Sequence, residues 1–149
     1  MTDVNRKALG LARINAGHAG IAPELIKTSG LDGVEDRFDL IVANPPYILD
    51  PDQLTYRDGG GLHGGEVSVQ WARAALPRLT DRGRFVLYTG VAIIAGADPV
   101  REALDRVAAE AGFALRYREL DPDIFSQQLG REGYEDVERI AAVAAVFQR

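Results

Sequence analysis

The residues best suited to chemistry lie at the end of one stretch of this sequence, FDLIVANPPY, which spans residues 38–47. Asn44 supplies an amide and Tyr47 an aromatic ring, and two prolines separate them. Consecutive prolines fix φ and cannot donate backbone hydrogen bonds, so the pair predicts a stiff, extended loop. The simpler alternative is an ordinary Asn-Pro turn after a core strand. We favour a ligand-binding loop, because the apolar run, the double proline and the aromatic ring occur together.

The element that must position this loop is the apolar run before it. Residues 38–43 are nearly all apolar and include β-branched side chains, with Asp39 as the one polar residue. Such a short run predicts a strand buried on both faces. Ligands of open α/β sheets bind at the carboxyl ends of the strands, which is where Asn44 would stand.

The segment IVANPPY, residues 41–47, resembles the catalytic motif of S-adenosylmethionine-dependent amino-group N-methyltransferases. These enzymes act on adenine or guanine amino groups, or on a glutamine side-chain amide. The resemblance implies catalytic roles for Asn44, Pro45, Pro46 and Tyr47. The Asn44 side-chain oxygen and the Pro45 carbonyl would accept the two N–H bonds of the acceptor nitrogen, and Tyr47 would stack on its planar group.

The resemblance also implies the fold: an α/β, Rossmann-like three-layer sandwich with a mostly parallel sheet and an antiparallel last strand. Residues 1–149 would form the C-terminal portion of one such domain, without its N-terminal strands. The strand at 38–43 would then expose an apolar edge, since the strand expected beside it is missing. We therefore expect a marginally stable or aggregating chain, or one whose sheet is completed by a homodimer or by a missing N-terminal segment.

The cofactor implied by the resemblance is S-adenosylmethionine. Asp3 stands where family members have an acidic residue that binds the cofactor ribose, and Asn44 would border the same site. Ser29 and Gly30 occupy the position for the adenine, where the family usually has an acidic residue; Asp32 is a possible substitute. The glycine-rich turn of the family has no counterpart in the sequence.

Residues 48–65 form a long, glycine-rich segment after the motif. Loops of this length in a compact domain are usually functional or disordered, so we expect a mobile loop that covers the substrate. Its candidate contacts are Tyr56, Arg57 and His63, although solvated loop residues are the more common case. His18 and His63 stand alone in the sequence, and no metal site is predicted.

Periodicity predicts the remaining elements. The helices are expected at 6–16, 66–80 and 99–111, and a loop is expected at 90–98. The other strands are expected at 22–28, 84–89, 113–120 and 139–147, the last of them central and antiparallel.

Composition limits the classes of partner and substrate that we expect for this chain. The chain has 149 residues, no cysteine and a formal net charge of −5. No apolar run approaches a membrane span, and the start lacks a signal-peptide pattern, which together favour the cytoplasm and no membrane partner. Acidity favours a protein glutamine as substrate, whereas the prevalence of nucleic-acid substrates favours an RNA or DNA base. A non-catalytic partner or binding subunit is the alternative to an enzyme.

Overall fold

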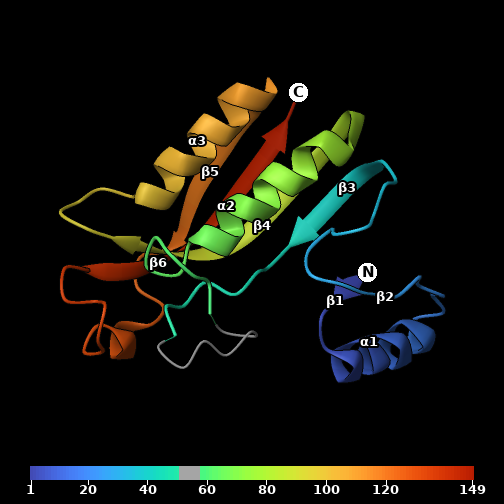
Figure 1. Cartoon of the computed structure of the whole chain (residues 1–149), viewed down its shortest axis with the longest axis horizontal. Coiled ribbons are helices and arrows are strands. Elements are labelled where there is room, and N and C mark those ends of the chain that lie inside the picture. The colour runs from blue at the N-terminus through green and yellow to red at the C-terminus, as the bar shows by residue number, and fades with distance from the viewer. Residues whose placement is uncertain (51–57) are drawn as a thin grey trace. The chain divides into compact units, whose positions relative to one another are not determined.

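The computed structural model describes residues 1–50 and 58–149 (Figure 1). The chain divides into two compact units, Met1–Asp36 and Arg37–Arg149. Each unit has its own sheet, so each is described by itself.

The first unit is a small strand–helix–strand arrangement. Its elements are β1 (Thr2–Asp3), α1 (Arg6–His18) and β2 (Ile26–Lys27). The two strands are parallel, and Asp3 pairs with Lys27. Helix α1 begins where the sequence predicted, because the Asn5 side chain accepts a hydrogen bond from the Lys7 amide at 2.9 Å. Strand β2 is much shorter than the predicted strand at 22–28.

The second unit contains a four-stranded mixed sheet. Its elements are β3 (Phe38–Ala43), α2 (Glu66–Ala75), η1 (Leu76–Arg78), β4 (Leu79–Ile93), α3 (Pro99–Ala111), β5 (Ala114–Asp121), η2 (Ser126–Gln128) and β6 (Arg139–Gln148). The strand order is β3-β4-β6-β5. Strand β3 is parallel to β4, whereas β6 runs antiparallel to both of its neighbours. The predicted α/β class, with an antiparallel last strand in a central position, is confirmed.

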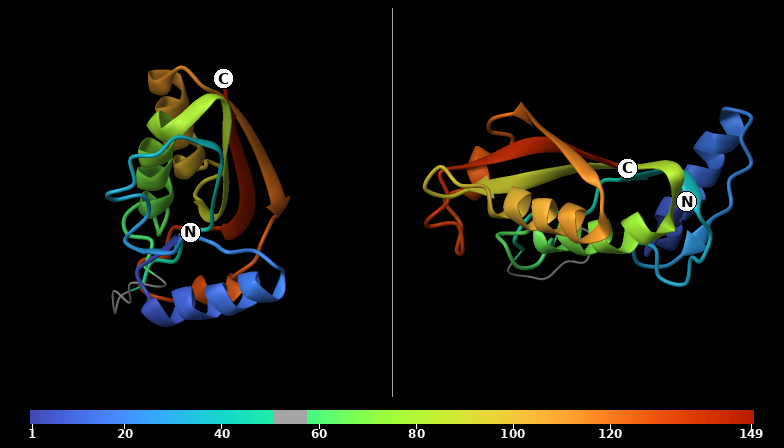
Figure 2. Two further views of the ribbon diagram at one scale, coloured as in Figure 1. Left: turned by 90° about the vertical axis from the view of Figure 1, so that its right-hand side faces the viewer. Right: turned by 90° about the horizontal axis from the view of Figure 1, so that it is seen from above.

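The two long helices of this unit lie side by side on one face of its sheet (Figure 2). Helix α3 has the predicted ends: the Asp98 side chain caps the Arg101 amide at 2.8 Å, and Gly112 takes the left-handed conformation at φ 71°. Helix α2 is shorter than predicted, because Pro77 lies in the 3-10 turn that follows it.

Side chains of β3 alternate between the covered and the open face of this sheet. Ile41 pairs with Phe85, and Phe85 is fully buried. Leu40 and Val42 are 58% and 69% exposed. The prediction that this strand is buried on both faces is therefore wrong for this structure, since α2 and α3 cover one face only. As expected, β3 also lies at an edge of its sheet.

Strand β4 extends well past its predicted end at Thr89. It continues to Ile93, which pairs with Arg139 at the start of β6. The predicted loop at 90–98 is thus wrong over its first four residues, because β6 supplies a partner for each of them. Within the described parts of the chain, no helix is long and apolar enough to cross a membrane.

Candidate active site

The motif loop begins where β3 ends. Ala43, the last residue of β3, pairs with Leu87 in the middle of β4. Pro45 is buried and Pro46 is half-buried, so the double proline anchors the loop to the unit. Asn44 is exposed, and its amide has no hydrogen-bond partner among the described residues. Its side chain is therefore available to a ligand at the carboxyl end of the strand.

Tyr47 is held by aromatic neighbours. Its ring centroid lies 6.3 Å from that of Tyr88, in an edge-to-face arrangement at 73°, and 6.0 Å from that of Phe125. Burial, followed by the neighbouring Tyr88 hydroxyl, raises the pKa of Tyr47 above its ordinary value. The phenol is consequently neutral at physiological pH, as a stacking surface for a neutral planar group requires.

Gly90 gives the Tyr47 ring its room. A Cβ atom at position 90 would lie 2.4 Å from Cδ2 of that ring. Any larger residue would have to displace the ring, so Gly90 is a positioning residue for Tyr47. Sequence analysis missed Gly90 and Phe125, because nothing in the sequence indicates that either of them approaches the motif.

The glycine-rich segment after the motif packs against the motif loop. The Gly59 amide donates a hydrogen bond to the Ile48 carbonyl at 2.8 Å. A Cβ atom on Gly59 would lie 1.7 Å from the Gly64 carbonyl oxygen and 2.8 Å from the Tyr47 Cα. Its described part, residues 58–65, thus packs against the motif backbone. The expected role of the loop in covering the substrate stays a prediction. Tyr56 and Arg57 lie outside the described residues.

His63 also connects this segment to the rest of the unit. Its Nε2 lies 3.0 Å from Asp136 Oδ1, and its ring lies 6.3 Å from that of Tyr134. The Tyr134 hydroxyl in turn accepts a hydrogen bond from the Leu49 amide at 2.8 Å. His63 therefore connects the glycine segment to residues 134 and 136, and its role as the third predicted substrate contact stays a prediction.

The predicted cofactor residues of the first unit lie at one edge of its small sheet. Asp3 ends β1, and Ser29 and Gly30 follow β2, which is parallel to β1. Asp3 Oδ1 accepts a hydrogen bond from the Asn5 amide at 2.7 Å, which fixes the carboxylate at the start of α1. Its second oxygen has no partner among the described residues. This carboxylate fits a vicinal diol such as that of a ribose.

A family model of the methyltransferase small domain matches residues 1–56. The chain is also 33% identical to a release factor glutamine methyltransferase of Deinococcus radiodurans over 133 residues, a match that covers 85% of this chain and 46% of that protein. A second release factor glutamine methyltransferase, from Agrobacterium fabrum, is 32% identical over 124 residues, which cover 76% of this chain and 42% of that protein. The chain thus spans less than half the length of these two relatives.

The fold is similar to that of a solved methyltransferase from Pyrococcus furiosus. The TM-score is 0.63 at 21% identity, and the similarity covers 99% of this chain and 60% of that one. At this identity the similarity shows the fold alone. Together with the sequence matches, it confirms the resemblance to class I methyltransferases and the Rossmann-like fold class that the resemblance implies.

Proposed function

We propose that this chain carries the acceptor site of an S-adenosylmethionine-dependent N-methyltransferase that acts on a glutamine side-chain amide of a protein. The observation that carries the proposal is the exposed Asn44 amide on a proline-stiffened loop, beside the packed Tyr47 ring; this amide has no hydrogen-bond partner in residues 1–50 and 58–149. The two relatives named above, both release factor glutamine methyltransferases, support glutamine over a nucleic-acid base. We further propose that both units belong to one methyltransferase domain, and that it works in the cytoplasm.

An amide nitrogen is a poor nucleophile, because its lone pair is delocalised into the neighbouring carbonyl. Asn44 Oδ1 and the Pro45 carbonyl would accept its two N–H bonds and orient the lone pair out of the amide plane. Tyr47 would stack on the planar amide and fix that plane. The chain thus contributes position and local electrostatics rather than a strong base.

Asp3 of the first unit suits the cofactor that the proposal requires, and it would bind the ribose hydroxyls. Ser29 and Gly30 would border the adenine, where the resemblance implies an acidic residue. In the second unit, Asn44 would be the residue that contacts the cofactor. S-adenosylmethionine, when bound, supplies an electrophilic methyl group on a sulfonium. We propose Asp32 as the substitute for the missing acidic residue. The Asp32 amide donates a hydrogen bond to the Ser29 carbonyl at 3.0 Å, so the turn at 29–32 holds Asp32 next to Ser29.

Calorimetric titration of S-adenosylmethionine tests the cofactor site. We expect micromolar binding to the chain and a loss of about tenfold or more in the Asp3→Asn variant, since a carboxylate binds a diol through charge-assisted hydrogen bonds. Asp3→Asn retains an oxygen for the Asn5 amide, so α1 keeps its turn. The control is Glu35→Ala, which removes an exposed carboxylate of the same unit and should bind as the wild type does. An absence of binding to the wild type would contradict the cofactor assignment.

A non-catalytic binding subunit is the second candidate function. The observation that favours it is Ser29-Gly30, where an acidic residue would be expected beside the adenine. Such a subunit would show no methyl transfer to any acceptor.

Completion of the sheet by a homodimer or by an N-terminal segment stays a prediction. Such a neighbour would pair with the free backbone edge of β3, which lies at the end of its sheet.

A further inference from the structure

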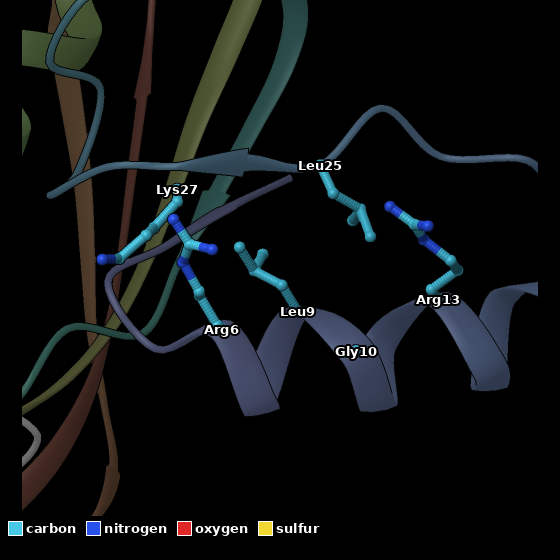
Figure 3. A pocket seen from close by; sticks show the side chains of 6 residues that line it. All are labelled: Arg6, Leu9, Gly10, Arg13, Leu25 and Lys27. Carbon is cyan, nitrogen blue, oxygen red and sulfur yellow. The ribbon is translucent and has the colours of Figure 1, made fainter.

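The first unit contains a pocket that sequence analysis did not anticipate. It has a volume of about 380 Å³. Its lining residues come from one face of α1 and from the segment around β2: Arg6, Leu9, Gly10, Arg13, Leu25 and Lys27 (Figure 3). None of these residues has a role in the acceptor site or the cofactor site proposed above.

Three cations surround the pocket, and none has a carboxylate partner in the described part of the chain. Arg6 and Arg13 project from α1 and Lys27 from β2, and all three are exposed. No described carboxylate lies within ion-pair distance of them, and α1 has no acidic residue anywhere along its length. This concentration of positive charge stands out in a chain whose net charge is −5. It is complementary to an anionic ligand.

The floor between the cations is aliphatic. Leu9 is buried and Leu25 half-buried, and Figure 3 shows their side chains pointing toward each other between Arg6 and Arg13. Single-stranded nucleic acids bind largely by stacking bases on aromatic rings. Residues 1–36 contain no Phe, Tyr or Trp. An aliphatic floor between cations instead suits a peptide that carries both carboxylates and an apolar side chain.

We propose that this pocket binds an acidic segment of a protein partner, with a leucine-like side chain on Leu9 and Leu25 and with carboxylates at Arg6, Arg13 and Lys27. Seven residues along a helix span roughly 10 Å, so Arg6 and Arg13 receive carboxylates on either side of the apolar contact. Identification of this partner as the methylated protein itself rests on the proposed function. The pocket would then bind a part of the substrate other than the glutamine that is methylated.

Fluorescence anisotropy of a labelled peptide, with glutamates on both sides of a leucine pair, tests the proposal on the complete 149-residue chain. We expect saturable binding that weakens with salt, and about tenfold weaker binding of the same peptide with glutamines in place of the glutamates. Replacing its leucines with serine should also weaken it. A single-stranded RNA of equal charge should bind less tightly than the acidic peptide.

Two charge-matched variants on the same helix show whether the pocket is the binding site. A Cβ on Gly10 meets no atom within 4 Å, so Gly10→Glu folds and places a carboxylate among the three cations. We expect it to reduce peptide affinity about tenfold. Leu11 is 63% exposed and does not line the pocket, so Leu11→Glu makes the same charge change with little effect. Circular dichroism checks that both variants retain the fold.

Three results would overturn the proposal: no binding of the acidic peptide to the wild type, equal affinity in Gly10→Glu and Leu11→Glu, or tighter binding of the RNA. The assay measures binding without methyl transfer. If the peptide does not bind, the proposal of an acceptor site at Asn44 is unaffected. If the chain transfers no methyl group, the proposal of a peptide-binding pocket is unaffected.

Discussion

We expect Asn44→Ala to reduce methyl transfer by about a thousandfold, because under the proposed function the acceptor nitrogen loses the side-chain oxygen that orients it. Asn44 is exposed and makes no hydrogen bond within the described residues. Its loss should therefore leave the free energy of unfolding within about 0.5 kcal/mol of the wild-type value. Initial rates with methyl-labelled S-adenosylmethionine, together with thermal melts, measure both quantities.

The matched control is Asn15→Ala, which removes an exposed asparagine from α1 in the first unit. It should transfer methyl groups at the wild-type rate. Cofactor affinity, measured by calorimetry, should be largely retained in Asn44→Ala, since Asn44 acts on the acceptor. Near-normal turnover in this variant would remove Asn44 from the catalytic site.

We expect Gly59→Ala to destabilise the second unit by about 1 to 3 kcal/mol, the range for a side chain forced into a packed interior. The added Cβ would lie 1.7 Å from the Gly64 carbonyl oxygen and 2.8 Å from the Tyr47 Cα, and neither backbone atom can move independently. The shift passes to Tyr47, so turnover should fall as well. Urea unfolding followed by Trp71 fluorescence measures the loss, because the single tryptophan of the chain lies on α2 in this unit.

Gly130→Ala is the control for this variant. A Cβ at position 130 meets nothing within 4 Å, and the position lies in the same unit. Its unfolding midpoint should match that of the wild type. If Gly59→Ala were as stable as Gly130→Ala, the glycine segment would not be packed against the motif loop.

Local signals in the sequence were sufficient to predict the start of α1, the end of α3 and the end of the motif strand. Asn5 and Gly112 mark helix ends through chemistry that involves only neighbouring residues, and the structure has both ends at these positions. The motif stretch likewise ends its strand just before the double proline, because neither proline can donate a hydrogen bond to a neighbouring strand.

Features that depend on distant contacts could not be predicted in this way. Gly90 indicated the end of a strand, but the structure has it within β4, where its missing side chain makes room for Tyr47. The glycine-rich segment predicted a mobile loop over the substrate. The close packing of Gly59 and Gly64 against the motif backbone could not be predicted, because it depends on the tertiary fold. Leu40 and Val42 are as apolar as core residues, so the sequence does not show that α2 and α3 leave them exposed.

The unexpected basic pocket has a similar explanation. Arg6 and Arg13 lie seven residues apart, and Lys27 lies in another element. Along the sequence they are scattered charges of an acidic chain, and only the pairing of β1 with β2 brings Lys27 beside α1.

Mass spectrometry of an acceptor protein, after incubation with this protein and S-adenosylmethionine, shows directly whether a glutamine is methylated. We expect a single added methyl group on a glutamine side chain, absent from reactions with Asn44→Ala. A methyl group on an RNA base, or on any protein residue other than glutamine, would contradict the glutamine assignment. No methyl transfer from the wild type to protein or RNA would favour the non-catalytic subunit instead.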